Sequence, residues 1–395
     1  MNEFAFIDQL RRQTESRKHS TRVIKGIGDD ASVIAEAGNR DLIVTTDLLV
    51  EDIDFIRSAT PPRLLGHKAL AVSLSDIASM GARPFWSFLS IGMPRETWND
   101  KFKDEFFEGF FALADQFGVT LAGGDVSETK QDVVIDSIVL GEVASGAAVL
   151  RSGAKPGDQI FISGTLGGAA AGLKLIEKGA RVDQRSEVRD QRSVPPTESR
   201  STSPTVREDS VSEPGTVATG SNEAPMAKTQ TDDDAIQSLL LRQLRPSPRV
   251  GWGIVLGEER LASAMIDLSD GLSSDLRHVC EESRVGALID SASIPLDEDV
   301  KHLCGRRALD PLALALHGGE DFELLFTVSP ENVSRLPKRV DGVAIIRIGE
   351  ITDALGQISI REKDRVWDLQ AKGFEHFAGH SPDSADAVDS LNSLP

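Results

Sequence analysis

The chain has 395 residues, of which 40% are hydrophobic and 27% charged, and its formal net charge is -19. This length and composition are typical of a globular protein with two domains and a sizeable core. The acidic balance argues against nucleic acid as a partner, because phosphate backbones are bound by basic surfaces. Small phosphorylated ligands remain compatible with it, provided that metal ions supply the missing positive charge.

The first part of the chain predicts helices and strands in mixed order. Its predicted elements are a helix over 3–13, a buried strand at 42–44, a helix over 61–84, a strand over 85–94, a helix over 97–117, and two strands within GVTLAGGD and DVVIDSIVLGEV that flank a glycine turn. Because strands and helices do not alternate strictly, this order favours an α+β fold.

A second unit is expected from about residue 146. A strand over 158–164 leads through a glycine turn into a helix that ends at 179, and SAMIDLSDGLSSDLRHVCEESRVGALID predicts a strand, a turn, a helix and a strand. The expected domains are therefore 1–145 and 146–380, followed by a frayed tail over 381–395.

The segment 181–233 interrupts the second unit with a different composition. Ser, Thr, Pro, Glu and Arg dominate it, and large apolar residues are nearly absent. Such a segment cannot bury enough surface to offset its ordering entropy, so it is expected to be disordered. We interpret it as a tolerated surface insertion rather than a regulatory arm.

Sequence features also bear on the compartment. Cys280 and Cys304 form no C-x-x-C pair, which favours buried free thiols in a reducing compartment. The start of the chain lacks the basic and apolar regions of a signal peptide, and no apolar run approaches the length of a membrane span. We therefore expect a cytoplasmic protein with no membrane partner.

Acidic residues recur where apolar runs end, beside Gly, Ser or Thr. They are Asp29 and Asp30 in GIGDDA, Asp47 in VTTDLL, Asp76 in SLSDIA, Asp125 in AGGDVS, Asp267 and Asp270 in IDLSDG, and Glu320 and Asp321 in HGGEDFELL. Any one of them is consistent with a turn or a helix N-cap. Several of them in one cleft would not all stay ionised, because two carboxylates about 4 Å apart repel by roughly 4 kcal/mol at an effective dielectric of about 20.

The acids together therefore predict a site for several magnesium ions that handles phosphates. Carboxylate oxygens suit Mg²⁺, which bridges them to substrate phosphates, and Thr45 and Thr46 could add hydroxyl ligands. No GxxxxGK[ST] loop is present. SGTLGG at 163–168 could offer backbone amides to phosphate, although a strand-to-helix turn is the preferred interpretation. Arg151 is either a surface arginine or a phosphate contact at the junction of the two units.

Nine motifs stand in the order and spacing of bacterial thiamine-monophosphate kinases. They are GIGDDA, TTDLLVEDIDF, HKALAVSLSDIASMGARP, AGGDVS, RSGAKPGD, FISGTLGGAAAGL, IDLSDGLSSDL, HGGEDFELL and GFEHF. The chain resembles this family over nearly all of 3–377, apart from the insertion. The resemblance implies a two-domain fold of the aminoimidazole ribonucleotide synthetase-like superfamily, a homodimer formed through the N-terminal sheets, and ATP-dependent phosphorylation of thiamine monophosphate to thiamine diphosphate.

The resemblance also implies residue roles. The metal ligands would be Asp30, Thr45, Thr46, Asp47, Asp76, Asp125, Asp267 and Asp270; the ATP contacts Gly124, Asp125, Arg151 and Ser269; and the substrate contacts Glu320 and Phe374. Many relatives carry His where this chain has Asp54, which leaves the substrate contact of Asp54 open. Its carboxylate could pair with the cationic thiazolium, which is our own inference.

We expect direct in-line transfer of the γ-phosphoryl group to the phosphate of thiamine monophosphate. The nucleophile is already anionic, so no general base is required, and magnesium would neutralise the repulsion between the two anions. One alternative is another ATP-dependent kinase or synthetase of the same superfamily. A second is a non-catalytic divalent-cation-binding protein, although the chain has no D-x-D-x-D-G loop with a distal Glu.

Overall fold

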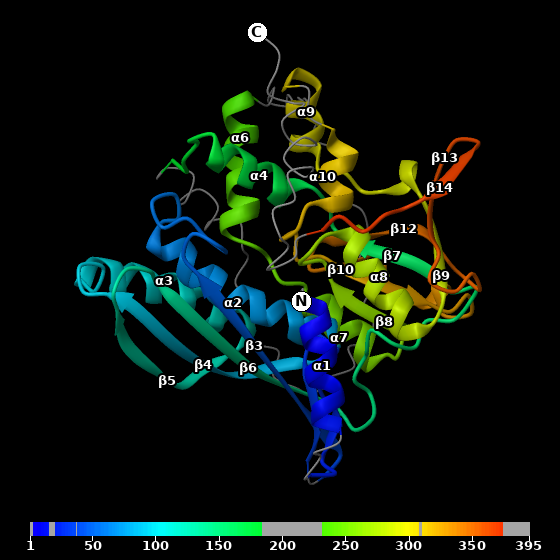
Figure 1. Ribbon diagram of the computed structural model, residues 1–395, viewed down its shortest axis with the longest axis horizontal. Helices are drawn as coiled ribbons and strands as arrows, with labels where there is room; N and C mark the ends of the chain where they lie inside the picture. The colour runs from blue at the N-terminus through cyan, green and yellow to red at the C-terminus, as the bar shows by residue number, and fades with distance from the viewer. Residues whose placement is uncertain (1–2, 16–19, 37, 184–230, 308–309, 374–395) are drawn as a thin grey trace, which may run out of the picture.

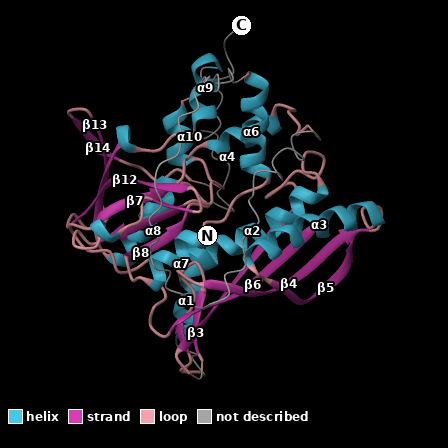
Figure 2. Ribbon diagram, turned by 180° about the vertical axis from the view of Figure 1, so that it is seen from behind, coloured by secondary structure: helices cyan, strands magenta, loops and turns pink. Residues whose placement is uncertain are grey.

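The computed structural model describes residues 3–15, 20–36, 38–183, 231–307 and 310–373. It contains a six-stranded sheet in the N-terminal part and an eight-stranded sheet in the C-terminal part. Figures 1 and 2 show the two sheets as separate layers, and the helices α4, α6, α9 and α10 lie together at the top of both views. The expected α+β fold is confirmed; the division into two domains stays a prediction.

The six-stranded sheet has the order β1-β2-β3-β6-β4-β5, and only β4 and β5 pair in parallel. Helices α2 and α3 cover one face of this sheet (Figures 1 and 2). The elements of this part are α1 (Glu3–Glu15), β1 (Val23–Lys25), β2 (Ser32–Ala35), β3 (Arg40–Val50), α2 (Pro62–Ser79), β4 (Arg83–Pro94), α3 (Asp100–Phe117), β5 (Thr120–Thr129) and β6 (Val134–Ala144).

The eight-stranded sheet has the order β14-β13-β9-β12-β7-β10-β8, with β11 paired to β12. Its strands are β7 (Gln159–Ser163), β8 (Ala262–Asp267), β9 (Gly286–Asp290), β10 (Leu324–Val328), β11 (Arg339–Val340), β12 (Val343–Thr352), β13 (Ile358–Glu362) and β14 (Arg365–Asp368). The helices of this part are α4 (Gly168–Glu177), α6 (Asp232–Leu244), α7 (Val250–Glu258), α8 (Leu272–Ser283), α9 (Glu298–Arg307) and α10 (Pro311–His317), with short 3-10 turns η1 (Ser291–Ser293) and η2 (Val333–Arg335).

Helix α2 lies at the centre of the molecule and is buried along nearly its whole length. It contacts β3, β6 and α3 in the N-terminal part and α6, α7 and β8 in the C-terminal part. Pro62 starts it, since its fixed φ and missing N–H suit the first turn. Gly66 permits close packing on α3, because a Cβ there would lie 1.9 Å from the carbonyl oxygen of Phe106.

Among the described residues, buried apolar side chains form three clusters, and the largest of them joins the two parts. The largest cluster includes Phe106 and Phe110 of α3, Trp252 of α7 and Phe326 of β10. A second cluster fills the C-terminal sheet around α8, and a third packs α4, α6 and α9 together. The shared core explains how side chains far apart in sequence are held at fixed separations around α2.

Some predicted boundaries differ from the structure. The strand expected at 42–44 runs from Arg40 to Val50, so the acidic half of this segment is also strand. Gly123 and Gly124, expected in a turn, lie inside β5. The strand after them begins only at Val134, so the chain reverses after Thr129.

The predicted disordered segment, 181–233, extends too far at both ends, because 181–183 and 231–233 belong to the described structure. The backbone N–H of Asp183 donates to Gln237, and Thr231 caps α6 in a reciprocal capping box with Asp234. The remainder of the insertion, the tail over 381–395 and Phe374 lie outside the described residues. Cys280 and Cys304 are buried free thiols, as expected. Among the described residues, no helix has the length and apolar content to cross a bilayer.

Candidate metal and phosphate site

Three of the recurring aspartates converge between the two parts of the chain. Asp30 comes from the turn before β2, Asp76 from α2, and Asp267 from the end of β8. Each offers one carboxylate oxygen, and these oxygens all lie within 4.8 Å of one another. Residues separated by more than 230 positions thus form one compact acidic cluster.

Hydroxyl groups fix the carboxylates of this cluster. Thr45 Oγ1 lies 2.5 Å from Asp76 Oδ2 and 3.3 Å from the carbonyl oxygen of Asp30. The Ser75 hydroxyl donates to Asp267 Oδ2 at 2.6 Å and so links α2 to β8. Asp47 lies on the same face of β3 as Thr45, because alternate strand residues share a face.

Burial and mutual repulsion disfavour ionisation in the cluster. Burial, followed by the neighbouring carboxylates, raises the pKa of Asp76 well above its ordinary value. For Asp267, burial and Asp30 raise the pKa to about 8. For Asp47, burial and the nearby Asp136 and Asp30 raise the pKa to about 6. A bound dication would reverse this preference, because it stabilises the ionised carboxylates.

The donor set fits a hard cation. Within the described part of the chain, Asp30 Oδ2 and Asp47 Oδ2 are buried and have no hydrogen-bond partner. A buried polar atom without a partner is costly, and an oxygen-binding ion such as Mg²⁺ would satisfy both oxygens. Asp30, Asp47, Asp76 and Asp267, with the Thr45 hydroxyl, are therefore the residues that can hold metal.

Arg151 closes one side of the cluster. Its Nε donates to Asp30 Oδ1 at 2.8 Å, and its backbone N–H donates to Asp29 Oδ1 at 3.1 Å. Lys25 Nζ lies 3.1 Å from the other oxygen of Asp29. Asp29 thus positions the Arg151 backbone, and the Arg151 guanidinium is directed at the acids.

Thr46 and Asp125 lie on the opposite face of the sheet. Thr46 Oγ1 donates to Asp136 Oδ1 at 2.9 Å, and the register pairs Asp136 with Ser90 and Ser90 with Asp125. Paired residues share a face, so within one chain the structure does not bring Thr46 or Asp125 to the cluster. Gly124 has a packing reason to be glycine, since a Cβ there would lie 1.9 Å from the Leu89 carbonyl oxygen.

Ser269 and Asp270 lie in the loop between β8 and α8. The Ser269 carbonyl accepts a 2.8 Å bond from the Glu320 N–H, so this loop lies against the GGED segment. Buried Asp275 accepts from the N–H groups of Asp270 and Gly271, at 3.3 and 3.0 Å, and fixes the loop. Gly373 donates to Ser274 Oγ at 3.0 Å, which brings the residue before Phe374 to the first turn of α8.

Lys68 of α2 joins Asp54 and Glu320, two of the predicted substrate residues. Its Nζ lies 2.6 Å from Glu320 Oε1 and donates to the Asp54 carbonyl oxygen at 3.2 Å. The Asp54 carboxylate accepts from the Val50 N–H at 2.7 Å, which closes the turn after β3. Asp54 therefore has a structural contact within its own turn, and its predicted contact with substrate stays a prediction.

The backbone amides at the end of the glycine turn 163–168 are hydrogen-bonded to a carboxylate. Asp321 accepts from the N–H groups of Gly167 and Ala169, at 2.7 and 3.1 Å, at the start of α4. Burial raises the pKa of Asp321 to about 6. Because these amides are already engaged, the structure supports the strand-to-helix turn rather than a phosphate loop.

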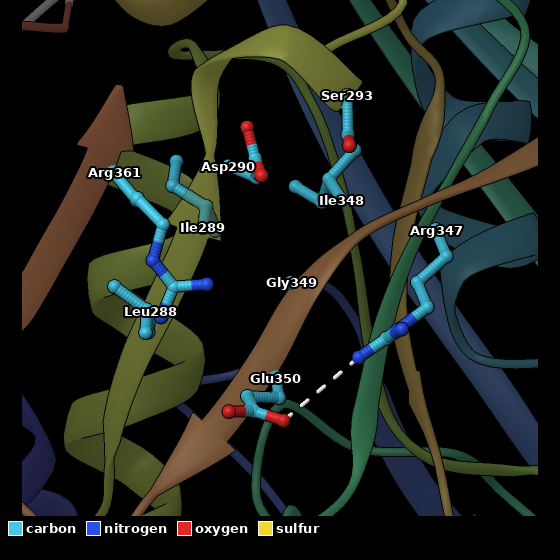
Figure 3. A pocket seen from close by; sticks show the side chains of 9 residues that line it. All are labelled: Leu288, Ile289, Asp290, Ser293, Arg347, Ile348, Gly349, Glu350 and Arg361. Carbon is cyan, nitrogen blue, oxygen red and sulfur yellow. Dashed lines mark ion pairs between the residues drawn. The ribbon is translucent and has the colours of Figure 1, made fainter. Parts of the chain in front are cut away.

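A separate hollow of about 180 Å³ lies on the C-terminal sheet (Figure 3). Within it, Arg347 lies 3.8 Å from Glu350 on the same strand. Its lining contains none of the predicted site residues, so it has no link to the acidic cluster. It is lined by Leu288, Ile289, Asp290, Ser293, Arg347, Ile348, Gly349, Glu350 and Arg361.

Sequence reasoning missed several residues that shape the site. Most of them act through a predicted residue: Ser75 binds Asp267, Asp136 binds Thr46, and Asp275 holds the loop of Ser269 and Asp270. The signal for Lys68 was present, since it is followed by seven uncharged residues before Asp76 in a helix that is otherwise mostly apolar. The missed residues are Lys68, Ser75, Asp136, Asp275 and Gln243 of α6, whose side-chain amide donates to the Glu320 carboxylate.

Comparison with known proteins identifies the family. Residues 28–143 match the family described as AIR synthase related protein, N-terminal domain. Thiamine-monophosphate kinase of Buchnera aphidicola from Schizaphis graminum is 32% identical over 380 residues, which cover 95% of this chain and 99% of the relative. This chain belongs to the thiamine-monophosphate kinase family. Thiamine-monophosphate kinase of Escherichia coli K12 is 34% identical over 359 residues, covering 89% of this chain and 92% of that one.

Solved structures of the thiamine-monophosphate kinase family agree with this assignment. AaThiL complexed with AMPPCP and TMP matches with a TM-score of 0.71 and 26% identity, over 95% of this chain and 97% of that chain. The enzyme from Stenotrophomonas maltophilia K279a matches with a TM-score of 0.64 and 33% identity, over 91% and 96%. The HypE–HypF complex, at 17% identity and a TM-score of 0.60, shares the fold alone.

Proposed function

We propose that this chain catalyses the ATP-dependent phosphorylation of thiamine monophosphate to thiamine diphosphate, in the cytoplasm. The observation that carries the proposal is the convergence of Asp30, Asp76 and Asp267 within 4.8 Å, in a chain of the thiamine-monophosphate kinase family. A cluster of this kind binds two acidic ligands only with the help of cations.

Magnesium ions would be held by Asp30, Asp47, Asp76 and Asp267, with the Thr45 hydroxyl beside them. Bound there, they would neutralise and align the two phosphate groups. We propose Asp270 as a further ligand from the adjacent loop. The predicted nucleotide contacts are Arg151, which pairs with Asp30, Ser269, which follows Asp267 by two residues, and Gly124.

The protein itself would supply position and charge rather than a base. The attacking group is an anionic phosphate oxygen, so in-line transfer needs no proton acceptor. Arg151 would exchange its contact with Asp30 for a contact with ATP phosphate. Glu320 would face the cationic end of the acceptor, together with Asp54 and Phe374.

We also propose a homodimer formed through the uncovered face of the N-terminal sheet. Large apolar residues are exposed there, including Leu48 at 59% and Trp86 at 51%, and exposed apolar patches mark association sites. Thr46 and Asp125 lie on this face, so a second copy would complete their surroundings. Trp86→Glu is expected to yield a monomer in sedimentation; an unchanged mass would reject this interface.

The decisive test mixes the purified full-length protein with ATP, Mg²⁺ and thiamine monophosphate and follows thiamine diphosphate by chromatography. Product that depends on all three components supports the proposal. ATP consumption only with a different acceptor would indicate another enzyme of the superfamily. Cation binding with no ATP turnover for any acceptor would indicate a binding protein.

A further inference from the structure

We infer that Lys68 is a positioning residue that fixes the Glu320 carboxylate at the acceptor end of the site. This inference rests on the proposed function, since it concerns how the same site would hold thiamine monophosphate. Lys68 belongs to α2 in the N-terminal part, and Glu320 belongs to the loop before β10.

The burial of Lys68 calls for a partner. Its side chain is 1% exposed, and lysine is almost never fully buried unless it is paired. The ammonium has two partners, the Glu320 carboxylate at 2.6 Å and the Asp54 carbonyl at 3.2 Å. One cation therefore ties the turn after β3 to the GGED loop of the other part.

Glu320 is held at both carboxylate oxygens. Lys68 engages Oε1, and the side-chain amide of Gln243, from α6, donates to Oε2. The Glu320 backbone has φ of 65°, a left-handed conformation that is uncommon outside glycine and occurs at sites where surrounding contacts enforce it. The side chain still remains 28% exposed, so it is oriented and yet accessible to a ligand.

Helix α2 relates this end of the site to the metal cluster. Lys68 and Asp76 are eight residues apart on one helix, which separates them by about 12 Å along its axis. Asp76 belongs to the acidic cluster, so Lys68 marks a second position on the same helix. An acceptor whose phosphate lies at the metals would direct its other end toward Glu320.

A purely structural alternative is that Lys68 only stabilises the contact between the two parts. Loss of such a contact would lower stability and the active fraction, but KM for thiamine monophosphate would stay unchanged. A positioning role predicts a selective change in KM for the acceptor. The two substrates of the proposed reaction therefore provide the distinguishing measurement.

The experiment compares wild-type protein, Lys68→Met and Lys68→Arg, with Lys101→Met as a control at a lysine that is 82% exposed. For Lys68→Met we expect KM for thiamine monophosphate to rise about 10- to 100-fold, as for loss of a charged hydrogen bond. KM for ATP is expected to stay within about threefold, because Arg151, the charged contact predicted for ATP, is bonded to Asp30 of the acidic cluster and not to Glu320. Lys68→Arg should recover part of the loss, and Lys101→Met should behave as wild type.

A second variant covers the case in which Lys68→Met does not fold. Gln243→Met removes the other contact of Glu320, and it should raise KM for thiamine monophosphate in the same selective way. Wild-type activity with unchanged acceptor KM in the folded variants would overturn the inference while leaving the proposed function intact. Equal increases in both KM values would also overturn it. A wild-type protein that does not phosphorylate thiamine monophosphate would instead reject the proposed function itself.

Discussion

Arg151 donates through Nε to Oδ1 of Asp30 at 2.8 Å, across the boundary between the two parts of the chain. The same aspartate contributes an oxygen to the acidic cluster. In the proposed site, metal and guanidinium would compete for this one carboxylate, and ATP phosphate would offer the guanidinium another partner.

Arg151→Met should consequently move two affinities in opposite directions. KM for ATP is expected to rise about 10- to 100-fold, because a charged phosphate contact is lost. Mg²⁺ should bind more tightly in the absence of ATP, because Asp30 is no longer neutralised. Calorimetry with Mg²⁺ alone and initial rates at varied ATP measure the two effects. Arg83→Met, at an arginine that is 55% exposed, is the matched control; a variant equal to it in both measurements would refute the assignment.

Asp76→Asn should separate activity from stability. Turnover is expected to fall by orders of magnitude even at saturating Mg²⁺, and Asp47→Asn should act in the same direction. The melting temperature in EDTA should stay the same or increase, because the substitution removes a buried carboxylate whose ionised form is repelled by its neighbours. Normal turnover of both variants, or a large loss of metal-free stability, would contradict this account.

The stability of the metal-free protein should depend on pH through Asp267 and Asp47. Their folded-state pKa values of about 8 and about 6 lie above the ordinary value of 3.8, so the folded state binds more protons between about pH 4 and pH 8. The free energy of unfolding contributed by these groups therefore falls as pH rises through this window. Melting curves in EDTA from pH 5 to 9 test this sign, with Asp267→Asn as the comparison.

Added Mg²⁺ should counter this loss, and its stabilising effect should be larger at pH 8.5 than at pH 5.5. The ion binds the ionised carboxylates and so releases protons on binding. Calorimetry in two buffers of different ionisation enthalpy measures that release. A difference between wild type and Asp267→Asn that does not vary with pH would reject the titration scheme.

Gly66→Ala should destabilise the protein strongly. The added Cβ would lie 1.9 Å from the Phe106 carbonyl oxygen, and that oxygen belongs to the backbone of α3 and cannot move independently. We expect a loss of about 3 kcal/mol in the free energy of unfolding, at the upper end for overpacking. Gly118→Ala, at a left-handed position with no atom within 4 Å, should cost only about 1 kcal/mol. Equal losses in urea titrations would contradict the close helix packing.

The fold followed from the sequence where apolar spacing was regular. Within the helix predicted over 97–117, Phe102, Phe106 and Phe110 recur at helical spacing, and all three are buried on α3. The acidic half of β3 was missed as strand, because Thr45 and Asp47 place polar atoms on the face that packs against α2. In sequence, polar residues on a buried strand face look like the start of a turn. Their presence is explained by the candidate site, which lies on that face.

The recurring acids predicted a cluster, and Asp30, Asp76 and Asp267 form one. Thr45 and Thr46 were both expected beside Asp47, but the strand continues through them, so they face opposite sides of the sheet. The contact of Lys68 with Glu320 was beyond reach, because it joins two elements that only tertiary packing brings together. The same holds for Asp321, whose carboxylate engages the amides at the start of α4.

Helix α2 carries side chains that hold both the acidic cluster and the predicted acceptor contact. Its Ser75 hydroxyl donates to Asp267 and its Lys68 ammonium pairs with Glu320. A substitution that displaces this one helix would therefore disturb both carboxylates, although no local relationship in the sequence connects them.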